Sequence, residues 1–484
     1  MGSRYEALYP YAPVWLQNLG ISLYGLAYKH ERLGGAFDAY VEQFVERESW
    51  DRTRMDRYLQ DELSKVLGHA FAQVPHYERV WKAAGFTRES IAAIGPAELH
   101  RLPATSKRDL RAAPESFVAR DIQAAKKLQT YATSGTSGTP IRCYCSADDH
   151  RRFRAGREAR SFRWAGTSVR MPRSMIGGRR VVPDGVARPP YYRYNMAEKQ
   201  VYFSAFHIAP GTMRDYVEGF ERYRPEVLTG YAYSHFLLAR MMQEAGVRLS
   251  YAPRALVLSS EKLTPVMKAT ILDAFGARAF EEYGSVEDCM LATECERGSL
   301  HVHPDFGIIE IVDDAGMPVP PGTEGRILCT SLLSETQPLI RYEIGDRGIW
   351  SADRCACGRD HLPVLQEIVG RLEDVITGKD GRQLVRFHWV YVDLPHIIEG
   401  QVIQEELDRF TLKLVVTPGF CAEDEEVIRR RFAERLGPVQ LRFEQVPTIP
   451  RTERGKFRAV ISRLPERNGG KVPSVVSKDV SHHV

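Results

Sequence analysis

The stretch 129-QTYATSGTSGTPIRCYC-145 carries the most information in this 484-residue chain. Its centre, residues 133–140, combines Ser and Thr hydroxyls with two glycines, between flanks of β-forming residues. Glycine permits backbone conformations that other residues resist, and successive N–H groups in such a turn can cradle an anion. Hydroxyl donors rotate to suit phosphate oxygens. The pattern therefore favours a phosphate-binding loop over a flexible linker, although the Gly-Lys-Ser/Thr of a P-loop does not follow the glycines.

Length and composition indicate a globular protein of two or more domains, because 484 residues exceed what one hydrophobic core organises. The chain is 43% hydrophobic and 26% charged, and its net charge of only +4 does not suggest a nucleic-acid binder. Arginines are dense between Arg151 and Arg180; we expect most to be solvated or ion-paired, and a minority to meet an anionic ligand. Eight cysteines without a visible export signal indicate thiols or metal ligands in a cytoplasmic protein.

The segment 10-PYAPVWLQNLGISLYGLAYK-29 is apolar, but Gln17 and Asn18 interrupt it and it is too short to span a bilayer. We expect a helix that packs on the main domain or on a second copy of the chain. Peripheral membrane contact is the less favoured alternative.

Hydrophobic periodicity divides the chain into four parts. Residues 1–86 predict helices, and 87–370 alternate helical stretches, such as 234–246 and 265–276, with short β-branched runs, which indicates α/β layers. Residues 371–464 predict a small α+β domain with an amphipathic helix over 424–437. Residues 465–484 are polar and poor in apolar side chains, which is typical of a disordered tail.

The segment with the phosphate-binding pattern resembles the corresponding loop of the adenylate-forming superfamily, which includes acyl-CoA synthetases, adenylation domains and luciferases. Further segments match the superfamily's motifs in order: 259-SSEKLTP-265, 281-EEYGSVED-288, 341-RYEIGDRG-348, 369-VGRLEDVI-376 and 448-TIPRTERGKFRAVIS-462. The chain is most similar to phenylacetate–CoA ligases and their relatives in polysaccharide and natural-product loci, over nearly its whole length. The resemblance implies a large ATP- and acid-binding domain, a small mobile carboxyl-terminal domain, and a reaction that joins a carboxylic acid to AMP.

The resemblance assigns nucleotide-binding roles to residues of these motifs. Glu287 would bind Mg²⁺, a hard cation held by one or two carboxylates and by phosphates, although an exposed turn glutamate is the ordinary alternative. Asp346 would accept both ribose hydroxyls, although Gly-Asp is common in turns. The remaining contacts to ATP would come from Thr133, Ser134, Gly135, Thr136, Ser137, Gly138, Ser260, Glu261, Glu281, Glu282, Tyr283, Gly284, Ser285 and Arg371. Of these, Glu281, Glu282 and Tyr283 would pass along the adenine, with Tyr283 stacking on it.

Lys456 lies in Arg454-Gly455-Lys456 near the end of the small domain. A long cationic side chain on a glycine-containing loop can reach the α-phosphate and the acyl oxygen as charge develops. A solvent-exposed lysine is the ordinary alternative, and the motif's position favours the catalytic role. In the resembling family the small domain turns about the linker 370-GRLEDVI-376 after adenylation, and we choose Asp374 as the hinge residue.

Cys355 and Cys357 form a Cys-X-Cys pair, and Cys295 precedes His301 by six positions. Three thiolates and one imidazole make a closed, structural type of zinc site. Some relatives of phenylacetate–CoA ligase carry zinc at this position, which supports the assignment. His303 competes for the fourth place, and buried free thiols with a packed histidine are the alternative.

An aromatic acid pocket is predicted where the relatives bind the acid. Its candidate residues are Tyr202, Phe206, His207 and Tyr231, for each of which core packing is an equal alternative. We expect a small aromatic acid and CoA as the acceptor. The amino-terminal segment departs from the degradative ligases, which leaves an amine or hydroxyl acceptor open. A non-catalytic, zinc-stabilised interaction protein is the alternative from another class, and a homodimer stays open.

Overall fold

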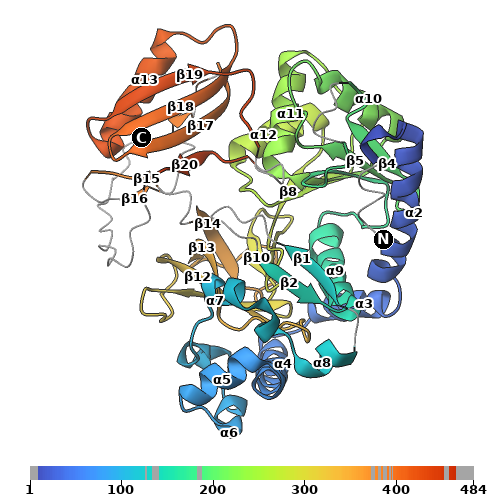
Figure 1. Ribbon diagram of the computed structural model, residues 1–484, viewed down its shortest axis with the longest axis vertical. Helices are drawn as coiled ribbons and strands as arrows, with labels where there is room; N and C mark the ends of the chain where they lie inside the picture. Colours follow the sequence, from blue (N-terminus) through green and yellow to red (C-terminus); the bar gives the residue numbers. More distant parts are fainter. Residues whose placement is uncertain are drawn as a thin grey trace. The chain divides into compact units, whose positions relative to one another are not determined.

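Two compact units make up the described chain. The computed structural model describes residues 9–125, 128–132, 141–182, 188–371, 376–379, 383–384, 390–391, 394, 396–451 and 457–464. The large unit contains the described residues up to Val369, and the small unit contains those from Gly370 onward. Figure 1 shows the elements of both units coloured along the sequence.

Helices dominate the amino-terminal part of the large unit, and amphipathic spacing explains them. In the longest, Arg52–Gln73, the side chain of Asp51 accepts a hydrogen bond from the Arg54 N–H at 2.7 Å and caps the first turn. Apolar residues three to four positions apart form its buried face. The helices and helical turns up to residue 125 are η1 (Tyr9–Tyr11), α2 (Val14–Leu33), α3 (Phe37–Arg47), α4 (Arg52–Gln73), α5 (Pro75–Ala83), α6 (Arg88–Ala92), η2 (Pro96–Arg101), α7 (Lys107–Ala112), η3 (Pro114–Phe117) and α8 (Arg120–Ala125).

A twelve-stranded sheet organises the rest of the large unit, in the order β11-β12-β13-β14-β10-β9-β8-β7-β6-β3-β5-β4. A separate hairpin pairs β1 (Gln129–Ala132) with β2 (Arg142–Cys145). The strands of the large sheet are β3 (Arg173–Gly177), β4 (Tyr192–Asn195), β5 (Gln200–Ser204), β6 (Val227–Tyr231), β7 (Ala255–Ser259), β8 (Ala279–Gly284), β9 (Leu291–Glu294), β10 (Leu300–Val302), β11 (Gly307–Val312), β12 (Glu324–Ser331), β13 (Tyr342–Trp350) and β14 (Val364–Arg371).

Strands β5, β3, β6, β7 and β8 form a parallel block within this sheet. Their near-continuous burial is typical of parallel strands covered on both faces. Gly230 of β6 has φ +120°, and a Cβ there would lie 1.9 Å from the Ile176 carbonyl oxygen, so the close strand approach requires glycine. The helical segments around the block are α9 (Ala147–Arg157), η4 (Glu158–Phe162), α10 (Met213–Tyr223), α11 (Ala232–Glu244) and α12 (Pro265–Phe275).

The small unit has its own sheet and core. Its four strands run in the order β19-β18-β17-β20, and α13 (Ala422–Leu436) supplies Ile428 and Phe432 to the core. The strands of this unit are β15 (Ile376–Thr377), β16 (Gln383–Leu384), β17 (Ile397–Glu406), β18 (Arg409–Val416), β19 (Gln440–Gln445) and β20 (Val460–Ser462). The predicted fold class, a large α/β domain followed by a small α+β domain, is confirmed.

A buried ion network fastens the amino-terminal helices to the sheet. The Asp305 carboxylate accepts hydrogen bonds from Arg47 Nε at 2.7 Å and from Arg160 Nη2 at 3.1 Å, and Arg160 also pairs with Glu48. Asp305 and Arg160 are fully buried. Burial opposes ionisation of the carboxyl, yet Arg160 and Arg47 hold the pKa of Asp305 at about 2.

We expect Asp305→Asn to lower the free energy of unfolding by about 3–5 kcal/mol, because it leaves buried guanidinium groups without their shared carboxylate. The effect should shrink as the pH falls from about 4, the pKa of an unfolded aspartate, toward 2, because the native carboxylate then protonates. Chemical denaturation at several pH values measures this. Asp56→Asn, which breaks an exposed pair with Arg52, should cost less than about 1 kcal/mol; equal losses in the two variants would contradict the role of the network.

Candidate functional site

The carboxyl ends of the parallel strands place several predicted residues along one edge of the sheet. Because β5, β3, β6, β7 and β8 run in the same direction, the residues that follow them all lie at that edge. Such an edge is where open α/β sheets bind ligands. The predicted residues there are Phe206 and His207 after β5, Tyr231 at the end of β6, Ser260 and Glu261 after β7, and Ser285 and Glu287 after β8.

Two motifs far apart in sequence meet beside this edge. The Tyr283 hydroxyl, at the end of β8, donates a hydrogen bond to Asp346 Oδ2 of β13 at 2.8 Å. Burial and the Asp346 charge hold the pKa of Tyr283 well above its usual value, so the hydroxyl stays a donor. The proposed adenine-contacting tyrosine therefore positions the proposed ribose-binding carboxylate.

Glu287 lies close to the same group. The Tyr342 hydroxyl donates to Glu287 Oε1 at 3.0 Å, and it is the one hydrogen-bond partner of that carboxylate among the described residues. The thiol of Cys329 is buried, and its pKa is raised by burial, by Cys289, and then by the charges of both Asp346 and Glu287. The structure thus brings the proposed magnesium and ribose ligands to one region, beside the same thiol.

Asp288, the next residue, is a feature that the sequence reasoning missed. Its φ of 47° is uncommon for a residue other than glycine, and such strain is frequent at functional sites. Burial raises the pKa of Asp288 to about 6, and this rise is opposed by Arg154 and Arg157. Arg157 in turn forms an ion pair with Glu282, donating from Nε at 3.2 Å. Glu282, which is predicted to lie along the adenine, therefore also forms an ion pair within the protein.

Arg154 presents a guanidinium without a carboxylate partner among the described residues. Its Nε donates to His150 Nε2 at 3.0 Å. Burial and nearby arginines lower the pKa of His150 to about 2, so this imidazole is a neutral acceptor. Its Nδ1 lies 3.4 Å from the Tyr131 hydroxyl, at the strand that leads into residues 133–140. The dense arginines between Arg151 and Arg180 indicated that a few of them would meet an anionic ligand, but the sequence did not identify which ones.

Other residues that are predicted to contact ATP also make contacts within the protein. Glu261 Oε2 accepts from the Tyr233 N–H at 2.9 Å, and Glu281 Oε1 accepts from the Leu263 N–H at 3.4 Å. Ser260 is exposed and has a left-handed φ of 72°. Ser285 Oγ lies 3.8 Å from Cys289 Sγ, and Gly284 is exposed at the end of β8.

The predicted acid-pocket residues are more polar in their surroundings than expected. Tyr202 is buried and accepts a hydrogen bond from Arg179 Nη1 at 3.1 Å. The Arg180 guanidinium lies 5.4 Å from the Phe206 ring centre. His207 Nδ1 lies 2.7 Å from Ser204 Oγ, and its ring stacks on Tyr191. Tyr231 is buried in β6, so it packs mainly as a core side chain.

The predicted zinc ligands come together. One ligand atom from each of Cys295, His301, Cys355 and Cys357 lies within 4.8 Å of the others. Cys295 Sγ lies 3.6 Å from Cys355 Sγ, and Cys357 Sγ lies 3.3 Å from His301 Nε2. His301 Nδ1 lies 3.2 Å from the Leu362 carbonyl oxygen, which leaves Nε2 for the cluster. His303, the competing residue, instead places Nε2 at 2.7 Å from Thr293 Oγ1.

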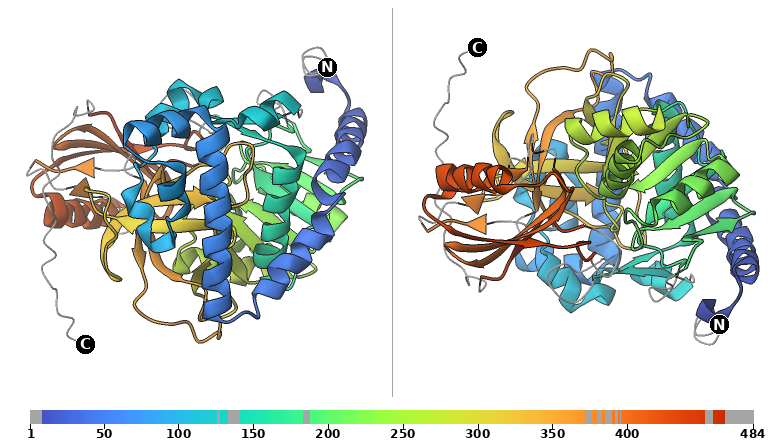
Figure 2. Two further views of the ribbon diagram at one scale, coloured as in Figure 1. Left: turned by 90° about the horizontal axis from the view of Figure 1, so that it is seen from below. Right: turned by 90° about the horizontal axis from the view of Figure 1, so that it is seen from above.

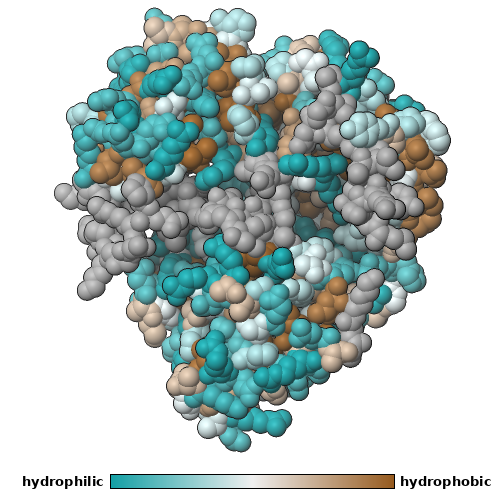
Figure 3. All heavy atoms as spheres, viewed as in Figure 1, coloured by the Kyte–Doolittle hydropathy of each residue, from teal (hydrophilic) through white to brown (hydrophobic). Residues whose placement is uncertain are grey.

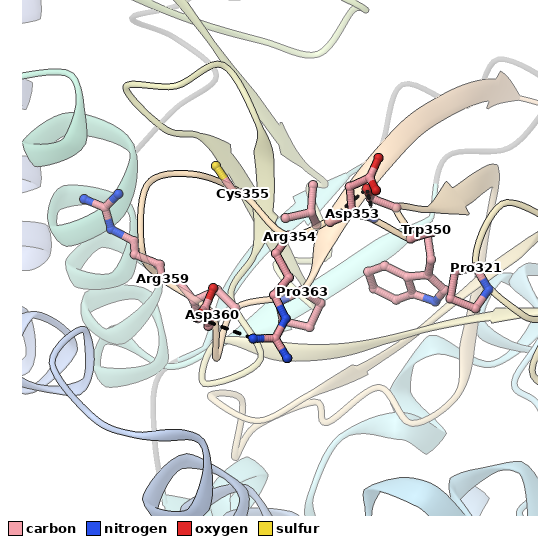
Figure 4. A pocket seen from close by; sticks show the side chains of 12 residues that line it. Pro321, Trp350, Asp353, Arg354, Cys355, Arg359, Asp360 and Pro363 are labelled. Atoms are coloured by element: carbon pink, nitrogen blue, oxygen red, sulfur yellow. Dashed lines mark hydrogen bonds and ion pairs between the residues drawn. The ribbon is translucent and has the colours of Figure 1, made fainter.

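A shallow pocket of about 260 Å³ lies beside this cluster, and none of the predicted nucleotide or acid residues lines it. Figure 4 shows the Cys355 sulfur at the other end of this pocket from Trp350 and Pro321. The pocket is therefore separate from the carboxyl edge of the sheet.

Several predicted residues lie outside the described part of the chain. They are Thr133, Ser134, Gly135, Thr136, Ser137, Gly138, Asp374 and Lys456. Arg371 ends β14, and only its backbone is described.

Comparisons with known proteins agree with this architecture. Residues 379–463 match the family model "CapK C-terminal domain". The chain is 25% identical to Protein CapK of Staphylococcus aureus (94% of this chain, 99% of the relative). It is 27% identical to the phenylacetate-coenzyme A ligase of Thermus thermophilus (86% of this chain, 98% of the relative). A solved 2-hydroxyisobutyryl-CoA ligase in the postadenylation state has a TM-score of 0.65 at 22% identity, covering 86% of this chain and 91% of that one.

These matches confirm the resemblance to the phenylacetate–CoA ligase-like branch and the adenylate-forming fold. Among the described helices, none has both the length and the apolar character needed to cross a membrane.

Proposed function

We propose that this chain, which matches the phenylacetate–CoA ligase-like branch of the adenylate-forming superfamily, is an AMP-forming acid ligase of the cytoplasm. It would use ATP to adenylate a small carboxylic acid and pass the acyl group to CoA. The observation that carries the proposal is the contact between Tyr283 and Asp346, with Glu287 in the same region. A nucleotide site needs these groups together, whereas a structural role would not require two motifs far apart in sequence to converge at the ligand-binding edge of a sheet.

We assign each of the predicted site residues a role in binding ATP. Asp346, held by the Tyr283 hydroxyl, would accept the ribose hydroxyls. Glu287 would hold Mg²⁺, which when bound neutralises phosphate charge; one carboxylate oxygen is oriented by Tyr342. Thr133 to Gly138 and Lys456 would donate to the phosphates, and Arg371 would contact the ribose or a phosphate. Together these groups orient two anions, the carboxylate and the α-phosphate, for attack.

The acid is proposed to be small and aromatic. Tyr202 lies within β5 and Phe206 follows its carboxyl end, and both would supply aromatic side chains to the acid site. Arg179 and Arg180 lie against these rings, which favours an aromatic acid with a polar or anionic substituent over a purely apolar one.

A panel of acids with hydroxylamine trapping and pyrophosphate release tests the activity. We expect release with at least one aromatic acid, and thioester formation when CoA is added. If the trapped acyl group reaches an amine or alcohol but not CoA, the ligase forms an amide or ester instead. Absence of pyrophosphate release with every acid would favour the non-catalytic, zinc-stabilised interaction protein.

Glu287→Gln is expected to raise the Mg²⁺ concentration for half-maximal adenylation by about 10–100-fold, because the change removes the charge of a hard-cation ligand at constant shape. Stability should change little. Tyr342→Phe, which keeps the charge and removes the orienting hydrogen bond, should give a smaller shift in the same direction. Adenylation by Glu287→Gln with an unchanged magnesium requirement would contradict the ligand assignment.

We also propose that Cys295, His301, Cys355 and Cys357 hold a structural zinc ion. In a tetrahedral site with Zn–S of about 2.3 Å, neighbouring sulfurs lie about 3.7 Å apart, which is close to the 3.6 Å between Cys295 and Cys355. The hydrogen-bond partner of His301 Nδ1 is the Leu362 carbonyl, the type of outer contact that orients a metal-binding imidazole. Four protein ligands leave no open position, so the ion would stabilise the fold and take no part in acyl transfer.

A further inference from the structure

Exposed apolar side chains concentrate on the amino-terminal helix. Of the thirteen exposed large hydrophobic residues in the described chain, seven lie between Tyr11 and Leu26. Trp15 is 67% exposed and Leu23 is 60% exposed. Figures 1 and 2 show α2 along the outer margin of the large unit, and Figure 3 shows hydrophobic atoms along that margin. The seven residues are Tyr11, Trp15, Leu16, Leu19, Leu23, Tyr24 and Leu26, and Met196 of the neighbouring turn is also exposed.

The opposite face of α2 is polar and is used to cover a sheet edge. Strand β4 is the last in the sheet order, so one side of its backbone lacks a neighbouring strand. Asn18 Oδ1 accepts from the Tyr194 N–H and Ser22 Oγ accepts from the Met196 N–H, each at 3.0 Å. Gln17 accepts from Arg193.

Close contact continues further along this face. A Cβ on Gly25 would lie 2.4 Å from the Asn195 side chain, so glycine permits the helix to approach the strand. The buried residues of α2 are Gln17, Ser22 and Gly25. A surface helix normally turns its apolar side inward, so α2 is inverted. Polar contacts fix its orientation, and its apolar side is presented outward.

The outward face has the composition of a membrane-interface helix. At about 100° per residue, Trp15, Leu19, Leu23 and Leu26 form one stripe. Residues 14–28 contain no acidic, lysine, arginine or histidine side chain. Leucine with Trp and Tyr is typical of helices that lie in the headgroup region.

Two exposed basic side chains lie near this face. They are Lys29, in the carboxyl-terminal part of α2, and Lys199, in the turn after β4. The acidic residue next to Lys199, Glu198, is buried in ion pairs with Arg32 and Arg173. The two lysines therefore complement an anionic lipid surface.

A second copy of the chain fits this face less well than a bilayer does. Twenty helical residues span about 30 Å, and a helix is about 10 Å wide, which gives roughly 300 Å² of contact. A specific interface needs about 800 Å² on each partner. A lipid surface requires neither that area nor a complementary shape. We propose that α2 docks this protein on the surface of an anionic lipid bilayer, with the stripe from Trp15 to Leu26 buried in the headgroup region.

The test uses the full-length protein and sucrose-loaded vesicles of phosphatidylcholine and phosphatidylglycerol. We expect the wild-type protein to sediment with the vesicles, and Leu19→Glu/Leu23→Glu to partition at least about tenfold less. Lys29→Gln/Lys199→Gln should lose about fivefold per lysine on anionic vesicles only. Brominated lipids should quench wild-type tryptophan fluorescence more than that of Trp15→Phe.

Val266→Glu/Leu272→Glu is the matched control, because it places two charges on exposed apolar positions of α12. It should bind vesicles as the wild type does, and all variants should show the wild-type circular dichroism and melting curve. Failure of the wild type to sediment, or an equal loss in the control, would overturn the proposal. So would light scattering that shows a wild-type dimer dissociated by Leu19→Glu/Leu23→Glu without any vesicle binding.

Discussion

Replacing Cys355 with Ser is expected to release one zinc ion per chain and to lower the melting temperature by at least about 5 °C. A serine hydroxyl does not ionise at neutral pH, so the proposed site loses one of three thiolates. Zinc binding contributes about 10–16 kcal/mol in small zinc-finger peptides, and each kcal/mol is about 2–4 °C for a domain of 150–250 residues. A loss of a few kcal/mol of stability at this site is therefore enough to produce the expected decrease in melting temperature. Activity should fall only through unfolding, since all four positions are filled by protein.

Metal analysis after reducing, chelator-free purification measures this prediction. His301→Gln should lose the metal, whereas His303→Gln should keep it, because His303 Nε2 faces Thr293 and not the cluster. This pair of variants separates loss of a ligand from general loss of stability. Wild-type protein without zinc would leave Cys295, Cys355 and Cys357 as ordinary thiols.

Local patterns in the sequence predicted the elements well, because each pattern reflects a nearby physical constraint. The helices expected over 234–246 and 265–276 are α11 and α12, and the one expected over 424–437 is α13. The resemblance also brought Tyr283 and Asp346 to one site, and these two residues touch. The order of the motifs along the chain indicated the fold that brings them together, which no single motif indicates.

Contacts between unrelated motifs could not be predicted in this way. The hydrogen bond from Tyr342 to Glu287 and the ion pair of Arg157 with Glu282 depend on how β13 and α9 pack beside β8 and the residues that follow it. No spacing in the sequence encodes that packing. Arg179 against Tyr202 is a similar case, and it places a cation beside a residue of the predicted aromatic acid pocket.

The amino-terminal helix shows a different limit. Periodicity identifies which residues share a face of a helix, but it does not say which face is covered. We expect the amino-terminal segment to form a helix that packs on the main domain or on a second copy of the chain. Helix α2 does lie against β4 of the large unit, but it contacts the protein through Gln17, Ser22 and Gly25 and not through its apolar stripe. The unpaired edge of β4 needed hydrogen-bond acceptors, and Asn18 and Ser22 provide them. A sheet edge thus determined the orientation of a helix more than its hydrophobicity did.

Lys456→Ala is expected to slow acyl-adenylate formation by about 100-fold or more, the usual effect of removing one group that stabilises developing charge. Lys456 lies outside the described residues, but the residues on either side of its segment belong to the small unit. Arg451 pairs with Glu399 of β17, and its guanidinium lies 5.0 Å from the Phe457 ring centre. The described residues on either side, Arg451 and Phe457, belong to the small unit, and we expect the lysine to travel with that unit.

Measuring adenylation and acyl transfer separately distinguishes a catalytic role of Lys456 from a structural one. If the small unit turns about 370–376 after adenylation, Lys456 has left the site before the acceptor attacks. Transfer from pre-formed acyl-adenylate to CoA should then change by only a few-fold in Lys456→Ala, while ATP-dependent formation of that adenylate is lost. Lys456→Arg should restore part of the rate, because the charge returns on a differently shaped group. Lys379→Ala, which removes an exposed lysine paired with Asp408 on the same unit, should leave both steps unchanged. Equal losses of adenylation and transfer in Lys456→Ala would mean that the lysine acts in a single closed arrangement, without the turn of the small unit.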